Sequence, residues 1–170
     1  MIKKKVCMLG AFAVGKTSLV QRYVNSIFHE KYQTTLGVKI DKKSITSEGQ
    51  PIELILWDLA GEDEFMEVRS AYLRGSAAVM LVADGTRDET LDIAIKLKNR
   101  VYSEVGTIPF ILLVNKSDLK DKWRIDQFML DQLANQGWEI LHTSAKSSEN
   151  VEDAFQRLAR QLIEPGERPS

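Results

Sequence analysis

The chain has 170 residues, of which 44% are apolar and 28% charged, with a formal net charge of −1. This composition is typical of a globular domain with one hydrophobic core and little room for a second. The balanced charge argues against a nucleic-acid-binding protein, and a single cysteine, Cys7, excludes a disulfide framework and suits a reducing cytoplasmic location.

The first predicted element is a buried strand over Val6–Leu9, followed by a segment, Gly10–Thr17, that fits the pattern G-x-x-x-x-G-K-[ST]. Apolar spacing then predicts a helix over Thr17–Asn25. Small residues in such a loop let backbone N–H groups surround a phosphate, and the positive end of the helix dipole faces the same anion. Lys16 adds a charge for the β- and γ-phosphates, and the Thr17 hydroxyl can bind Mg²⁺. The complete pattern in this setting disfavours the alternative, a chance glycine-rich turn.

Strand-like and helical segments alternate through the rest of the chain, after an irregular polar stretch over Phe28–Gly37. This alternation predicts an α/β fold with a mostly parallel six-stranded sheet, one antiparallel edge strand and about five flanking helices. Ligands of such sheets bind beyond the carboxyl ends of the strands. The later predicted strands are Val38–Thr46, Ile52–Trp57, Ala77–Ala83, Phe110–Val114 and Glu139–His142, and the later helices are Thr90–Val105, Ile125–Asn135 and Val151–Ile163, the last with Asn150 as a candidate cap.

Polar segments follow three of these strands. Asp58 ends one strand and is a candidate water-mediated anchor for Mg²⁺, or a simple turn residue, and Gly61 leaves a backbone N–H free to approach a γ-phosphate. In Asn115–Asp118, a carboxylate can accept both the exocyclic amine and the ring N–H of guanine, a pair that adenine lacks. Thr143–Lys146 can present a backbone N–H to the guanine carbonyl oxygen. Each segment alone is also ordinary turn or cap chemistry, but together they predict a guanine-nucleotide site.

In order and spacing these motifs resemble the Ras superfamily of small GTPases over nearly the whole chain. Gly37-Val38, Trp57-Asp58 and Tyr72–Gly75 look most similar to the Rab branch. The resemblance implies a single P-loop G-domain over residues 1–164, a short flexible tail over 165–170, and a monomer. It implies a molecular switch that binds GTP or GDP with Mg²⁺, hydrolyses GTP to GDP and phosphate, and engages effector and regulator proteins.

The resemblance also implies roles for single residues. Phe28 would pack against guanine, Tyr32 would close over the phosphates, and Thr35 would contact Mg²⁺ and the γ-phosphate, so that loss of the γ-phosphate releases its segment. The implied nucleotide-binding set is Ala13, Val14, Gly15, Lys16, Thr17, Ser18, Phe28, Tyr32, Thr35, Gly61, Asn115, Lys116, Asp118, Ser144, Ala145 and Lys146; the metal set is Thr17, Thr35 and, through water, Asp58; the catalytic set is Lys16, Thr35 and Glu62.

Three residues, Ile40, Trp57 and Tyr72, occupy the positions of the family's exposed apolar partner-binding triad. The alternative for them is ordinary sheet packing. Because Glu164–Ser170 holds no cysteine, no lipid-anchor site is visible in this sequence, so either the protein has no anchor or a longer tail carries it.

Two residues depart from the family pattern. Glu62 stands where the family has a Gln that orients the attacking water. Loss of one such donor costs roughly 3–4 kcal/mol, or about 10²–10³ in rate, so slow hydrolysis is expected unless a protonated Glu62 donates instead. The alternative function is a GTP-binding module with negligible hydrolysis that acts as a scaffold.

Phe12 stands where Ras has Gly. Its side chain could obstruct the catalytic arginine of an activating protein, cover the phosphates or face solvent. No arginine of the chain itself is assigned as a catalytic arginine finger.

Overall fold

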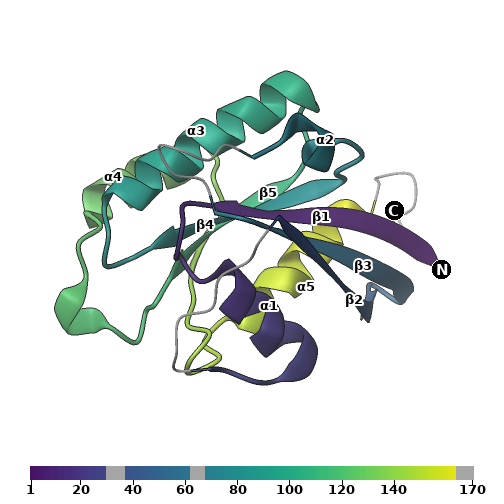
Figure 1. Ribbon diagram of the computed structural model, residues 1–170, viewed down its shortest axis with the longest axis horizontal. Coiled ribbons are helices and arrows are strands. Elements are labelled where there is room, and N and C mark those ends of the chain that lie inside the picture. The colour runs from purple at the N-terminus through teal and green to yellow at the C-terminus, as the bar shows by residue number, and fades with distance from the viewer. Residues whose placement is uncertain (30–36, 62–67, 164–170) are drawn as a thin grey trace.

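The computed structural model describes residues 1–29, 37–61 and 68–163, which form an α/β fold around one sheet (Figure 1). The prediction of fold class is confirmed. In chain order the elements are β1 (Ile2–Gly10), α1 (Lys16–Asn25), β2 (Val38–Ser47), β3 (Gln50–Leu59), α2 (Ser70–Leu73), β4 (Ala78–Asp84), α3 (Glu89–Glu104), β5 (Phe110–Asn115), the 3₁₀ helix η1 (Lys120–Lys122), α4 (Gln127–Asn135), β6 (Ile140–His142) and α5 (Val151–Leu162).

The six strands are arranged in the order β2-β3-β1-β4-β5-β6. The β2–β3 pair is an antiparallel hairpin at one edge, and every other neighbouring pair is parallel. The carboxyl ends of β1, β3, β4, β5 and β6 therefore meet along one edge of the sheet. Since β3 and β4 flank β1 on opposite sides, this edge includes the switch point at which ligands of such folds bind.

Two apolar clusters cover the two faces of the sheet. Along β1, Val6 and Met8 face the cluster formed with α1 and α5, whereas Cys7 and Leu9 face the cluster formed with α2, α3 and α4, as expected for alternating side chains. Figure 1 shows these two helical layers on opposite sides of the sheet. Burial on both faces explains why the central strands are almost continuously apolar in sequence.

Most element ends differ from the sequence prediction by one or two residues, and two starts and one cap have a clear physical reason. Strand β1 begins at Ile2, because the polar residues before Val6 still pair with β3. Helix α4 begins at Gln127 rather than Ile125, since the Asp126 side chain accepts a hydrogen bond from the Phe128 N–H at 3.0 Å and caps the helix there. Asn150 lies at the N-cap position of α5, but its amide donates to the His142 carbonyl, so its side chain does not cap the helix.

None of the helices in the described segments is both long and apolar enough to cross a lipid bilayer.

Candidate nucleotide-binding site

A cavity of about 310 Å³ lies where the carboxyl ends of the parallel strands meet. Its walls come from the loop after β1, the start of α1, the segment after α1 that holds Phe28, the end of β3 and the segment after it, and the loops after β5 and β6. Most of the predicted nucleotide-binding residues that the structure describes line it. The lining residues are Phe12, Ala13, Gly15, Lys16, Thr17, Ser18, Phe28, His29, Leu59, Gly61, Asn115, Lys116, Asp118, Leu119, Ala145 and Lys146.

The phosphate-binding loop turns sharply into α1 at Gly15, the N-cap residue, with φ +102°. A Cβ at this position would lie 2.3 Å from the Asn115 amide nitrogen, which is itself buried. Only glycine therefore satisfies both the backbone conformation and the close approach of the loop after β5. This glycine lets the first turn of α1 face the cavity with N–H groups that the helix itself does not use.

The ammonium group of Lys16 is buried in the floor of this loop. Its Nζ donates to the carbonyl oxygens of Gly10 at 3.4 Å and Ala11 at 3.3 Å. Burial lowers the pKa of Lys16 from 10.5 to about 8, and the charge of Asp58 opposes part of that shift. An anionic ligand in the cavity would favour the charged form of Lys16 and so raise its pKa again.

The hydroxyl of Thr17 donates to Asp58 Oδ2 at 2.7 Å, although these residues are 41 positions apart in the chain. The two side chains come from the start of α1 and the end of β3. Hydroxyl and carboxylate oxygens are hard ligands of the kind that Mg²⁺ prefers next to a bound phosphate. The described part of the predicted metal set thus fits Mg²⁺.

The loop after β5 is joined to both the phosphate-binding loop and the loop after β6. Asn115 donates through Nδ2 to the Val14 carbonyl at 3.0 Å and accepts from the Thr143 hydroxyl at 3.1 Å. Ser144 donates its hydroxyl to Asp118 Oδ1 at 2.7 Å, which fixes the carboxylate at the cavity wall. Val14 and Ser144, both among the predicted nucleotide-binding residues, therefore do not line the cavity but hydrogen-bond to residues that do.

Lys116 has two partners that sequence analysis did not assign to it. Its Nζ lies 2.8 Å from Asp84 Oδ2 and donates to the Ala13 carbonyl at 3.2 Å. Asp84, the last residue of β4, is fully buried. No local motif marks Asp84 in the sequence, and only its position at the same strand edge could have indicated a role.

Arg22 is a second residue that sequence analysis missed. From the outer part of α1 it donates through Nε to the Ala145 carbonyl at 2.6 Å and through Nη2 to the Lys146 carbonyl at 2.8 Å. Helix α1 thus starts at the phosphate-binding loop and, further along, holds the loop predicted to contact guanine.

The two segments predicted to respond to the γ-phosphate are described in part. A Cβ on Gly61 would lie 2.5 Å from the Cα of Phe12, so the segment after β3 touches the phosphate-binding loop backbone to backbone. Phe12 is 42% exposed. Tyr32, Thr35 and Glu62 lie outside the described residues.

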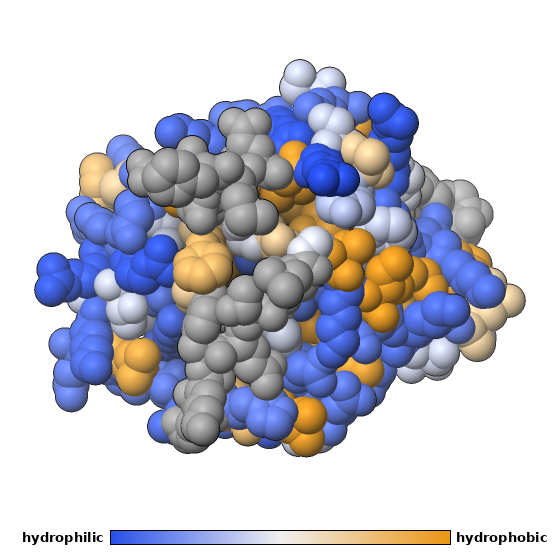
Figure 2. All heavy atoms as spheres, viewed as in Figure 1, coloured by the Kyte–Doolittle hydropathy of each residue, from blue (hydrophilic) through white to orange (hydrophobic). Residues whose placement is uncertain are grey.

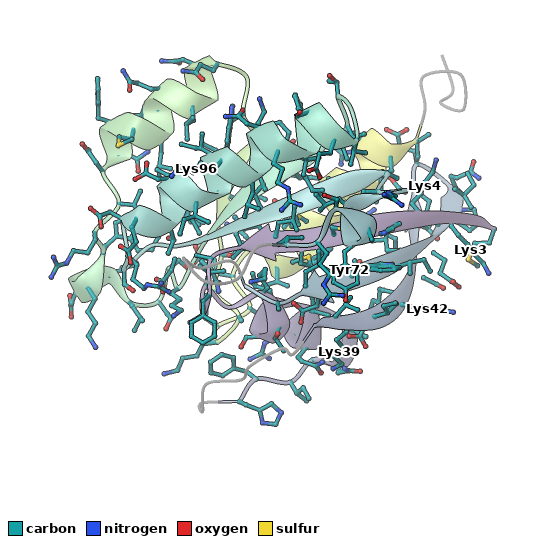
Figure 3. The ribbon with its side chains drawn as sticks, turned by 45° about the horizontal axis from the view of Figure 1, so that its top comes forward. Lys3, Lys4, Lys39, Lys42, Tyr72 and Lys96 are labelled. Carbon is teal, nitrogen blue, oxygen red and sulfur yellow. The ribbon has the colours of Figure 1, made fainter. Side chains whose placement is uncertain are left out.

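The three residues of the predicted partner triad lie next to one another in the structure. Ile40 pairs with Trp57 across the β2–β3 hairpin, and the rings of Trp57 and Tyr72 lie 6.4 Å apart. Ile40 is 47% exposed. Figure 2 shows apolar atoms gathered over the strands of this half of the sheet, and Figure 3 shows Tyr72 next to the sheet, with Lys39 and Lys42 of β2 near it.

Comparison with known proteins agrees with this geometry. A family model described as the Ras family matches residues 5–164. The chain is 35% identical over 161 residues to the Ras-related protein Rab-8B of Homo sapiens, covering 94% of this chain and 78% of that protein. It is 34% identical to Rab-13 of Bos taurus, covering 94% and 79%, and 36% identical over 170 residues to Rab-32B of Dictyostelium discoideum, covering 94% and 64%.

Proposed function

This chain belongs to the Ras family of small GTPases, and from that premise we propose that it is a slow switch whose GTP form presents ordered segments to effector proteins. It binds guanine nucleotide and hydrolyses GTP, as its Ras and Rab relatives do. The slow rate, the Mg²⁺ dependence and the individual site residues are the proposed part. The assignment of the site residues rests on the Asn115–Val14 hydrogen bond, which joins the predicted guanine motif to the predicted phosphate-binding loop at one cavity.

In the proposed reaction, water attacks the γ-phosphorus in line with the bond to the β–γ bridging oxygen, and that P–O bond breaks. Lys16 and the N–H groups of the phosphate-binding loop stabilise the charge on the phosphate oxygens. The Thr35 carbonyl and Glu62 orient the water. Because an ionised Glu62 offers no hydrogen-bond donor, this last contribution is weak and the step is slow.

Thr17, Thr35 and, through water, Asp58 would hold Mg²⁺. When bound, the ion neutralises charge on the β- and γ-phosphate oxygens. The 2.7 Å hydrogen bond from Thr17 to Asp58 supports this assignment, because it brings a hydroxyl and a carboxylate together at the N-terminus of α1.

Two measurements test the proposed function. The nucleotide released from the purified native protein by denaturation should be a guanine nucleotide, and GTP loaded onto the protein should be converted to GDP in a single turnover that stops when EDTA is added. Retention of uncut GTP for days would favour the scaffold alternative instead. Release of an adenine nucleotide would contradict the proposal.

We further propose that partners of the GTP form contact the surface formed by Ile40, Trp57 and Tyr72. Replacing Ile40 with Asp puts a charge at its most exposed apolar position and should weaken capture of GTP-dependent partners at least tenfold, as expected at an interface hot spot. Phe128→Asp is the matched control, since Phe128 is an apolar residue of α4 that is 64% exposed. Proteins retained by the GTP-analogue form and not by the GDP form are quantified for each variant. Equal losses with both variants would contradict the assignment.

A further inference from the structure

We propose that Arg87 is a positioning residue of the phosphate-binding loop, which holds the Phe12–Ala13 peptide so that the Ala13 N–H faces the nucleotide. Arg87 lies in the turn between β4 and α3, outside every motif of the nucleotide site. Its Nη1 donates to the Phe12 carbonyl at 2.7 Å, across 75 residues of sequence. The inference rests on the proposed function, because it gives Arg87 a role in the same site.

The carbonyl oxygens of Gly10–Val14 in this loop each accept a hydrogen bond from a side chain. Lys16 holds the first two, Lys116 holds that of Ala13, and Asn115 holds that of Val14. The remaining carbonyl, that of Phe12, is the one that Arg87 holds. Arg87 therefore completes a series in which each successive peptide has its oxygen fixed by a side chain.

Peptide geometry gives this contact a consequence inside the cavity. In a planar trans peptide the C=O and N–H groups point in opposite directions. The Phe12 carbonyl shares its peptide with the N–H of Ala13, a residue that lines the cavity. A cation on the oxygen therefore directs the N–H away from Arg87, and a charge-assisted hydrogen bond polarises the peptide so that its N–H is a stronger donor.

The backbone of Ala13 makes this support necessary. Its φ is +65°, in the left-handed region that residues with a Cβ rarely occupy. Such a conformation persists when the surrounding contacts determine it from several sides. Arg87 holds the peptide before Ala13 and Lys116 holds the peptide after it.

Arg87 is itself held in place. Its Nε lies 3.3 Å from the Glu89 carboxylate, and its carbonyl accepts from the Thr90 hydroxyl at 2.6 Å. The same turn begins at Asp84, the partner of Lys116. One short segment thus supports two adjacent peptides of the phosphate-binding loop, one directly and one through a lysine.

The test is the rate at which a fluorescent GDP analogue leaves the full chain, together with the single-turnover rate of GTP hydrolysis. Arg87→Gln should raise the dissociation rate about tenfold, the effect expected for loss of a partly exposed charge-assisted hydrogen bond, and should slow hydrolysis. Arg87→Lys should recover part of both rates, because the contact uses a single N–H. The charge-matched control is Lys96→Gln, on the exposed side of α3 (Figure 3).

Measuring Arg87→Gln in a second protein, the Ala13→Gly variant, distinguishes a role in positioning the loop from a general loss of stability. In Ala13→Gly the left-handed conformation carries no penalty, so Arg87→Gln should have a clearly smaller effect there than in the natural sequence. An equal effect in both backgrounds, or a dissociation rate for Arg87→Gln no different from that of Lys96→Gln, would overturn the inference. Failure of the unmutated protein to bind GDP would instead contradict the proposed function.

Discussion

Asp118→Asn should lower the affinity for GDP by roughly 10⁴-fold, because a site built to hydrogen-bond a substrate discriminates by that order when the bond cannot form. The carboxylate is held at the cavity wall by Ser144 and is proposed to accept two N–H groups of guanine. An amide in its place turns one acceptor into a donor that faces another donor. Equilibrium titration with a fluorescent GDP analogue measures the loss.

Binding of a nucleotide with a different base shows whether the loss is specific to the contact between residue 118 and the base. Xanthine carries a carbonyl where guanine carries the exocyclic amine, so the amide of Asp118→Asn should bind xanthosine diphosphate better than GDP. Asp121→Asn is the control, since Asp121 lies three residues away in η1, is exposed and does not line the cavity. Weak binding of both nucleotides by Asp118→Asn, in a protein that is still folded, would refute the proposed contact with the base.

Glu62→Gln should accelerate single-turnover GTP hydrolysis by about 10²–10³, the effect of adding one preorganised donor in the transition state. The change also removes a negative charge that would face the γ-phosphate. Glu64→Gln, in the same segment, removes the same charge and serves as the control. Rates of phosphate release from GTP-loaded protein are compared at pH 7.

The pH profile distinguishes the remaining alternative. If a protonated Glu62 is the donor in the natural chain, its hydrolysis rate should rise as the pH falls, whereas the rate of Glu62→Gln should stay flat. Equal rates for the unmutated chain and Glu62→Gln at every pH would show that Glu62 does not limit catalysis.

Much of the fold follows from local sequence signals. A continuous apolar run such as Ala77–Ala83 is buried on both sides only when helices cover both faces of the sheet. The motif Gly10–Thr17 predicts a strand before it, a tight loop and a helix after it. The edge at which the motifs meet follows from the parallel pairing of the strands. The predicted start of α4 was wrong by two residues. Ile125 is buried and fits the apolar pattern of the helix, but the N-cap residue is Asp126, so the helix begins at Gln127.

The supporting contacts of the site were not predictable in the same way. Arg22 and Arg87 each reach carbonyl oxygens that lie far away in the sequence, and a carbonyl acceptor leaves no mark on residue type. Asp84 ends an apolar strand much as Asp58 does, but it has no family motif around it. The motifs and the family resemblance therefore indicated the groups proposed to touch the nucleotide, whereas Arg22, Asp84 and Arg87, which hold parts of the site, are recognised only in the folded chain.

Helix α1 fixes the spacing between the two halves of the site. Its first residue, Lys16, belongs to the phosphate-binding loop, and Arg22, six residues later, holds the loop predicted to contact the base. A helix advances 1.5 Å and turns about 100° per residue, so one residue inserted between them would swing Arg22 off the loop while leaving every motif intact. The spacing of Lys16 and Arg22 along this helix therefore belongs to the recognition of the nucleotide together with the residues of the motifs.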